Sequence, residues 1–265
     1  MHGKLLTLVI WLVVAGSIAA SGQTGTTSAE QPASQSPAAA QPQVSPQAQQ
    51  KHAAAGKPNA IEALKVKAEA GDVAAQNKLG ETYALGTGVS RNLSQAAKWF
   101  LKAAQAGDPQ AQARIGLMYL AGFGVERDLK EALFWNNKAA AQGNKDAMLQ
   151  LARLYESGED VPKNGRESIK WYEQAAERGD VEAQVKLGWL YRDGFDNVEH
   201  DYQQAMKWLK KAAEQGSGEA EFNIGYMYEE GIGVVVNKEE AAEWYTKAKQ
   251  HGNVSAITRL RNLGR

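Results

Sequence analysis

A single interval of 36 residues organises most of this chain. Glycine returns at this interval, with one step of 37, at Gly71, Gly107, Gly143, Gly179, Gly216 and Gly252. Tryptophan keeps the same phase at Trp99, Trp135, Trp171, Trp208 and Trp244, and a tyrosine and an alanine series do so as well. Four residue types in one phase indicate an internal repeat. A repeat of this length is one supersecondary unit that must stack on its neighbours to bury its apolar face.

Each repeat predicts two helices. In the first repeat, Ala75, Leu79 and Tyr83 recur at the spacing of one helix face, and the Gly-Thr-Gly turn at 86–88 ends that helix. A second stripe of alanine and aromatic residues then fills 96–104. The predicted fold is therefore all-α, an α/α solenoid of about five 36-residue helix pairs with capping helices.

The pattern also sets boundaries. We expect the solenoid to cover 59–265, with repeats at about 70–105, 106–141, 142–177, 178–214 and 215–250. A lone leading helix at 59–70 and a C-terminal cap at 251–265 complete it. The single extra residue lies between Gly194 and Val198, where a loop insertion shifts the phase without interrupting a helix.

The small residues predict how the helices pack. Glycine stands inside four of the predicted first helices, at Gly80, Gly116, Gly188 and Gly225. Glycine in a helix costs roughly 1 kcal/mol relative to alanine, so we expect these positions to mark close contact between two helices. The periodic tryptophans are then expected to fill the core between the repeats.

The N-terminal part of the chain has a different composition. Residues 1–22 combine Lys4, an apolar run and small residues, which predicts a secretory signal cut after Ala19 or Gly22; an uncleaved signal anchor is the alternative. Residues 23–58 consist almost entirely of Ala, Gln, Ser, Pro, Thr and Gly, so a disordered linker is expected there. We therefore expect a periplasmic or secreted protein, with no stable membrane insertion once the signal is removed.

Charge and composition argue against several functions. The 30 basic and 30 acidic residues cancel, so no general attraction to nucleic acid is expected. There is no cysteine, and the four histidines form no metal-binding spacing. Neither a P-loop nor a nucleophile motif is present. We predict no catalytic residues, no metal, no cofactor and no enzymatic activity, although His200, with Asp196, Glu199 and Asp201 beside it, leaves a metal role open.

Residues 106–135, AGDPQAQARIGLMYLAGFGVERDLKEALFW, resemble the Sel-one-like repeat (SLR) family, relatives of the tetratricopeptide repeats. The resemblance covers about 59–265. Ala152, Asp160 and Ser168 depart from its pattern in the third repeat. The resemblance implies an adaptor that binds a protein or peptide, often in the bacterial envelope. Two alternatives remain: a β-lactam-binding or hydrolysing enzyme, as suggested for cysteine-rich relatives, and a secreted effector acting on host proteins.

A candidate binding surface follows from the positions that vary between repeats. The first helix of each repeat is expected to line the concave side, and the outward ridge of these helices carries the candidates. Trp189 is the one tryptophan after residue 22 outside the periodic series, so it either anchors a partner or adds packing. The predicted partner-binding residues are Lys78, Arg114, Leu117, Arg153, Lys186, Trp189, Asn223 and Tyr226.

Overall fold

A computed structural model describes residues 60–265 of the chain. The predicted signal at 1–22 and the predicted linker at 23–58 lie outside the described residues. The chain divides into two compact units between Arg91 and Asn92. The described part of the first unit holds α2 (Ala60–Glu69) and α3 (Val73–Leu85).

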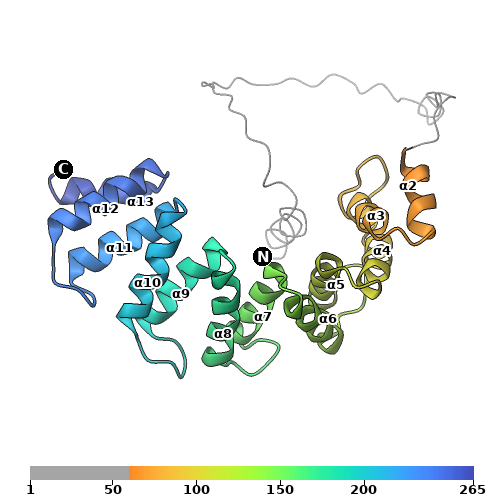
Figure 1. The fold of residues 1–265 in the computed structure, drawn as a ribbon, viewed down its shortest axis with the longest axis horizontal. Helices are drawn as coiled ribbons and strands as arrows, with labels where there is room; N and C mark the ends of the chain where they lie inside the picture. Colours follow the sequence, from red (N-terminus) through yellow and green to blue (C-terminus); the bar gives the residue numbers. More distant parts are fainter. Residues whose placement is uncertain (1–59) are drawn as a thin grey trace, which may run out of the picture. The chain divides into compact units, whose positions relative to one another are not determined.

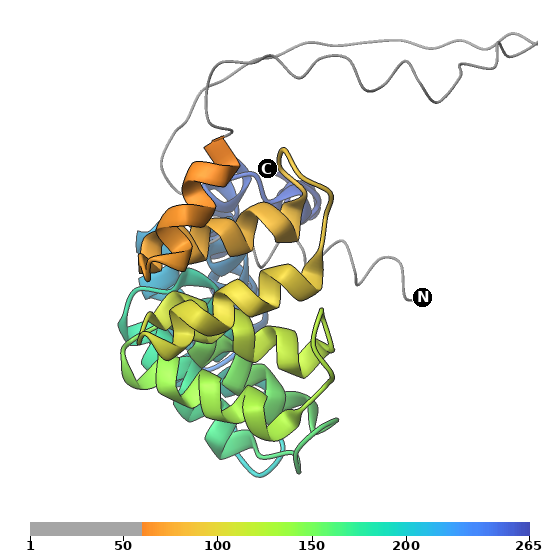
Figure 2. The ribbon, with the colours of Figure 1, turned by 90° about the vertical axis from the view of Figure 1, so that its right-hand side faces the viewer.

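The second unit holds ten helices, each packed against the next in chain order (Figures 1 and 2). They are α4 (Leu93–Gln105), α5 (Pro109–Ala121), α6 (Leu129–Ala141), α7 (Lys145–Ser157), α8 (Gly165–Glu177), α9 (Val181–Asp193), α10 (Tyr202–Glu214), α11 (Gly218–Glu230), α12 (Lys238–Gln250) and α13 (Val254–Asn262). Among residues 60–265 the β structure amounts to one isolated bridge, between Phe195 and Val198. The predicted all-α fold of stacked helix pairs is confirmed. No helix of this part is long and apolar enough to cross a bilayer.

Polar side chains cap the helix starts. Asp72 accepts a hydrogen bond from the amide of Ala75 at the start of α3. At α4 the cap is Asn92, which accepts a hydrogen bond from the amide of Gln95. Such caps satisfy amide groups that have no partner inside the helix. The repeat therefore encodes both ends of each helix locally.

The predicted close contacts occur at the helical glycines. A Cβ atom on Gly188 would lie 2.5 Å from Leu209 of α10. On Gly116 it would lie 2.6 Å from Asn136 of α6, and on Gly225 it would lie 2.8 Å from the Tyr245 ring of α12. In these three repeats the first helix therefore packs against the residue that follows the periodic tryptophan in the second helix.

The periodic tryptophans are less uniform than predicted. Three are buried: Trp99, Trp135 and Trp208. Trp171 and Trp244 are only partly buried, and the fully buried ring beside each is Tyr172 or Tyr245. In these two repeats the tyrosine is more deeply buried than the tryptophan, and Tyr245 packs onto the small position, Gly225, of the first helix.

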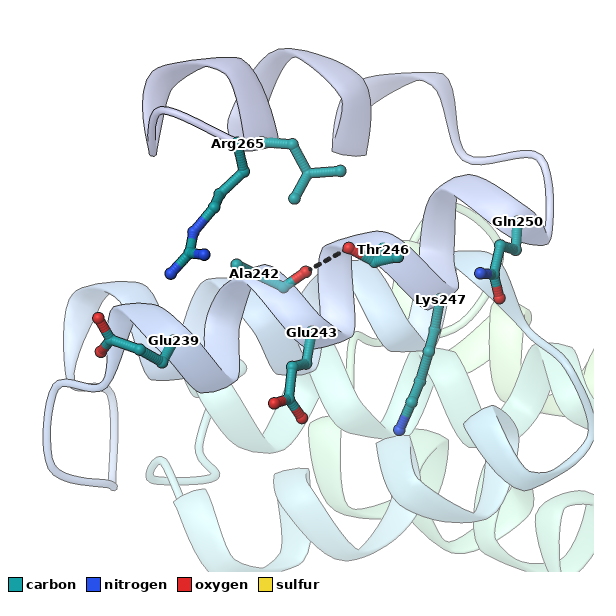
Figure 3. A pocket seen from close by; sticks show the side chains of 8 residues that line it. Glu239, Ala242, Glu243, Thr246, Lys247, Gln250 and Arg265 are labelled. Atoms are coloured by element: carbon teal, nitrogen blue, oxygen red, sulfur yellow. Dashed lines mark hydrogen bonds between the residues drawn. The ribbon is translucent and has the colours of Figure 1, made fainter.

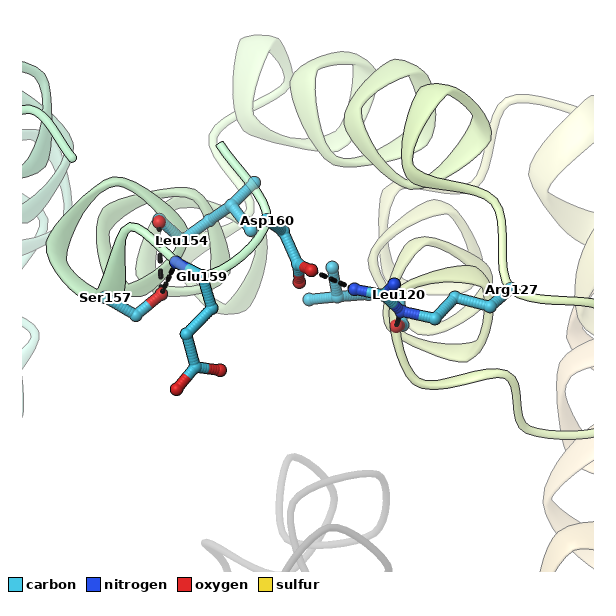
Figure 4. Close-up of polar contacts among 6 residues, drawn as sticks. All are labelled: Leu120, Arg127, Leu154, Ser157, Glu159 and Asp160. Carbon is cyan, nitrogen blue, oxygen red and sulfur yellow. Dashed lines mark hydrogen bonds and ion pairs between the residues drawn. The ribbon is translucent and has the colours of Figure 1, made fainter. Parts of the chain in front are cut away.

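The turns after the odd-numbered helices touch the preceding repeat. A Cβ atom on Gly124 would lie 2.2 Å from the backbone of Leu93, the first residue of α4, and one on Gly233 would lie 2.2 Å from Tyr202. In the third repeat Asp160 occupies this glycine position, and its carboxylate pairs with Arg127 of the preceding turn (Figure 4). The turns therefore form a second line of contact between repeats.

The insertion in the fourth repeat keeps this contact by other means. Its Asp196 accepts a hydrogen bond of 3.0 Å from the amide of Gly165, at the start of α8. A Cβ atom on Gly165 would lie 2.8 Å from the carbonyl oxygen of Phe195. In the turns of Gly124 and Gly233 the glycine that allows close approach of turn and helix lies in the turn, whereas here it lies at the helix start that faces the turn.

Candidate protein-binding surface

The odd-numbered helices of the second unit lie closer to one another than the even-numbered ones. α5 contacts α7, and α9 contacts α11, whereas no two even-numbered helices within 92–265 contact each other to a similar extent. This is the relation expected of the helices on the concave side of a helical repeat array. We call the solvent-facing side of α5, α7, α9, α11 and α13 the odd-helix surface.

Six of the eight predicted binding residues are at least partly exposed. Lys78, on α3 of the first unit, is exposed and pairs with Glu81 at 3.3 Å. Leu117 is partly buried on α5. The other four are also partly buried and lie on α7, α9 and α11: Arg153, Lys186, Trp189 and Tyr226.

Arg114 and Asn223 correct the predicted ridge, because both are buried. The guanidinium of Arg114 lies 5.2 Å from the centroid of the Phe100 ring. Asn223 donates a 2.7 Å hydrogen bond to the carbonyl oxygen of Glu219. Neither residue therefore stands on a solvent-exposed ridge, although Asn223 still lines the second of the two hollows described below.

Polar contacts link neighbouring odd-numbered helices in one register. The Lys186 ammonium lies 2.6 Å from Glu156, Arg192 donates a 2.8 Å hydrogen bond to Asn223, and Arg259 lies 3.4 Å from Glu229. The residue positions correspond from repeat to repeat: one side is Glu156, Arg192 and Glu229, with alternating charge, and the other is Lys186, Asn223 and Arg259. The basic residue of each of these three contacts therefore already has a partner within the chain.

Glu156 also binds the tyrosine hydroxyl beneath it. Tyr172 donates a 2.7 Å hydrogen bond to Glu156. Burial raises the pKa of Tyr172 above its usual range, and the hydrogen bond to this carboxylate raises it further. Glu156 thus joins the core of one repeat to Lys186 of the next.

Two hollows flank Trp189 on the odd-helix surface. The first, about 410 Å³, is lined by charged residues of α7, α9 and α11, including Arg153, Glu182 and Lys186. The second, about 590 Å³, reaches α13 and is lined by Phe222, Tyr226 and Arg259 among others. Trp189 and Glu219 line both hollows. The prediction that Trp189 binds a partner stays open, and its position beside two hollows is compatible with it.

Tyr226 lies between two guanidinium groups. Those of Arg192 and Arg259 lie 5.7 and 5.2 Å from the centroid of its ring. Arg192 is also held by Asp193, through two contacts of 2.6 and 2.8 Å. This arrangement fixes the ring in the wall of the second hollow, because both cations are themselves anchored.

A third hollow lies between α12 and α13 (Figure 3). Glu239, Glu243 and Lys247 line one side, and Arg265 reaches in from the end of the chain. The hydroxyl of Thr246 donates to the carbonyl of Ala242 within α12. None of the predicted binding residues lines this hollow.

The two histidines within residues 60–265 have structural contacts. His200 stacks on Tyr202 with the ring centroids 4.7 Å apart. Nδ1 of His251 lies 2.8 Å from the buried carboxylate of Glu221. Two equivalent junctions use a glutamine pair instead: Gln142 with Gln112, and Gln215 with Gln184. Within residues 60–265 no three His, Asp or Glu side chains are grouped so as to hold a metal ion.

Sequence reasoning missed several residues of the surface. Arg192, Phe222 and Arg259 line the second hollow, and none was among the predicted binding residues. A signal for the polar contacts is present in the sequence: Glu156, Arg192 and Glu229 occupy equivalent positions with alternating charge. Comparing such positions between repeats, and not only within one helix, reveals the cross-repeat pairs.

Comparison with known proteins supports the prediction of five helical repeats. The Sel1 repeat family model matches five segments: 73–108, 109–144, 145–180, 181–217 and 218–253. No curated protein matches the chain.

Two solved structures are similar over most of this chain. One is a protective antigen of uropathogenic Escherichia coli strains with an SLR fold, at 38% identity and a TM-score of 0.71, over 78% of this chain and 44% of that one. The other is a Sel1 repeat protein from Oxalobacter formigenes, at 36% identity and a TM-score of 0.66, over 77% and 58%. The chain thus spans about half the length of these relatives. Sel1 repeat proteins are in general interaction scaffolds and not enzymes. With five repeats matched in series, this chain belongs to the Sel1 repeat family.

Proposed function

We propose that this chain is an exported, non-enzymatic scaffold that binds a protein or peptide segment on its odd-helix surface. The observation that carries the proposal is the position of Trp189. This ring packs against the core of α9 to α11 and also lines two adjacent hollows. A large aromatic side chain in such a place is a common anchor for a partner, since it offers apolar area at little entropic cost.

Phe222 and Tyr226 extend the aromatic surface on α11. Both are partly buried, and both line the second hollow with Trp189. The three rings lie among charged residues, most of which are already paired within the chain, so the surface offers apolar contact surrounded by a polar rim. This composition is typical of protein interfaces.

Affinity capture tests the binding proposal. The bait is the chain from residue 23, incubated with a bacterial envelope extract, and the test variant carries Trp189→Ala and Tyr226→Ala. The matched control is Phe134→Ala, which removes an aromatic ring that is 51% exposed on the even-numbered helix α6. We expect proteins that bind the bait and the control but not the test variant. Equal capture by all three would remove the odd-helix surface from the proposal.

The location of the protein is part of the proposal and needs its own test. The apolar run and small residues of 1–22 support export. The intact mass of the protein purified from cells reports whether the segment is removed, and fractionation reports where the product lies. Full-length protein confined to the cytoplasm would contradict export without affecting the binding surface.

A further inference from the structure

One repeat register contains a carboxylate without the cation that the register before it supplies. Arg153 of α7 pairs with Glu182 of α9. One repeat later, Trp189 occupies the position of Arg153, and Glu219 occupies that of Glu182. The Glu219 side chain is exposed, and no side chain within residues 60–265 forms a hydrogen bond or ion pair with it. The replacement of arginine by tryptophan therefore leaves Glu219 open to a cation from outside the chain.

The remaining charges of the two hollows are already paired. Glu156 binds both Tyr172 and Lys186, and Glu182 binds Arg153. The cations of the second hollow, Arg192 and Arg259, are paired with acidic residues too: Asp193 for the first, Glu229 and Glu230 for the second. An acidic partner would have to break one of these pairs, whereas a basic partner can pair with Glu219 directly.

We propose that Trp189 and Glu219 form a recognition point for an arginine or lysine side chain of the bound protein segment. The inference rests on the proposed function and specifies the chemistry of the partner. The indole face attracts a cation, and the carboxylate supplies the opposite charge. Lys186 lies 5.9 Å from the Trp189 ring, but its charge is offset by Glu156 at 2.6 Å. Arginine fits best, because its planar guanidinium stacks and pairs at the same time.

Two short peptides test the charge requirement. The probes are acetyl-Gly-Gly-Arg-Gly-Gly-amide and the same peptide with citrulline, which keeps the shape of arginine and removes its charge. Binding is followed by NMR through the indole N–H resonance of Trp189, assigned with a Trp189→Phe variant. We expect a shift of this resonance with the arginine peptide, with a Kd of roughly 1–10 mM, the range of a single weak contact. Failure of the arginine peptide to bind, or equal binding of both peptides, overturns the inference.

Two variants test the residues. Glu219→Gln should weaken the arginine peptide by about threefold to tenfold, as expected for loss of one charge-assisted contact. Trp189→Arg should restore the internal pair seen at Arg153 and Glu182, and so abolish peptide binding while the protein remains folded. The control is Glu239→Gln, a change of the same kind in the third hollow, and it should leave the affinity unchanged.

The outcomes separate this inference from the proposed function. If capture from the extract requires Trp189 and Tyr226 but is insensitive to Glu219→Gln, the scaffold proposal stands and the basic recognition point is wrong. If capture is insensitive to all of these substitutions, the proposed surface is wrong as well.

Discussion

At the scale of single residues, one small position in each first helix sets how closely its second helix can pack. Gly188 illustrates it, because Leu209 fills the space that a Cβ atom would need. In the third repeat Ala152 occupies the equivalent position and is fully buried. The sequence identified the small position, but the residue packed on it differs from repeat to repeat and became known only from the structure.

Gly188→Ala should destabilise the fold although alanine is the better helix former. The gain in helix propensity is roughly 1 kcal/mol. A Cβ atom 2.5 Å from Leu209 requires the leucine or the helix to move, and overpacking of this kind costs about 1–3 kcal/mol. We expect a net loss of about 1 kcal/mol in the free energy of unfolding, measured by urea denaturation. A double-mutant cycle with Leu209→Ala should show less than additive loss. A stabilised Gly188→Ala variant would contradict the close contact.

Buried tyrosine hydroxyls predict a loss of stability at high pH. Burial raises the pKa values of Tyr172, Tyr191 and Tyr245, and each hydroxyl also donates to a glutamate. In the unfolded chain these groups ionise near pH 10, whereas in the folded chain they keep their protons to higher pH. Their contribution is fully present below about pH 10 and is lost as the pH rises through the folded pKa values.

The free energy of unfolding should therefore fall between about pH 10 and 12, by up to about 1.4 kcal/mol per pH unit for each tyrosine. Urea denaturation at several pH values measures the slope. Tyr172→Phe should make the slope shallower and cost about 1 kcal/mol at pH 7, where it removes a hydrogen bond. An unchanged slope in the variant would show that Tyr172 takes no part in it.

At the scale of elements, the residue size in each turn is complementary to the residue size at the helix start that it contacts. A turn with glycine in its last position approaches a helix that begins with a large residue, as Gly124 approaches Leu93. In the fourth repeat, where the turn has Phe195 and Asp196, the facing helix begins with Gly165. The sequence located the insertion correctly. Its compensation at Gly165 lies about 30 residues away, and no local pattern connects the two positions.

Gly165→Leu should destabilise the protein with its own 194–198 loop, and should be tolerated when a Gly-Thr-Gly-Val turn replaces that loop. Leucine begins α4 and α6, so its preference for helix starts is not the obstacle. The obstacle is the carbonyl oxygen of Phe195, 2.8 Å from the Cβ position. We expect a loss of about 1–3 kcal/mol in the free energy of unfolding, measured by urea denaturation. Replacing 194–198 by the Gly-Thr-Gly-Val turn of 86–89 should recover most of it. No recovery would mean that the clash arises elsewhere.

At the scale of the whole molecule, the fold depends on positions that repeat along the sequence, whereas the candidate site depends on positions that vary between repeats. Positions that repeat every 36 residues encode caps, turns and core, so the sequence alone predicted the helix pairs. The candidate site lies where the repeat changes, at Trp189 and Glu219. Burial there depends on the neighbouring helix, and for this reason Arg114 and Asn223, which look exposed on a helix diagram, are buried. Single-helix periodicity carries no information about that neighbour.

The stacked arrangement of 92–265 predicts how a core defect spreads. Each helix packs mainly on its neighbours in the chain, so stability is a sum of local and nearest-neighbour contributions. Trp208→Ala removes a buried ring of α10 and should cost about 3–5 kcal/mol. The loss should fall first on α8, α9 and α10, because the Trp208 side chain packs in the core cluster formed with α7, α8 and α9. Native-state hydrogen exchange, helix by helix, measures it.

The helices furthest from the substitution serve as the internal control. α4, α5 and α6 do not pack against α10, so their amide protection should change little in Trp208→Ala. The equivalent variant in an early repeat, Trp99→Ala in α4, should reverse the order in which helices lose amide protection, and α11 to α13 should stay protected. Equal loss of protection from α4 to α13 in both variants would show that the ten helices unfold as one block. In that case the repeats would unfold cooperatively, although each is a separate unit of the sequence.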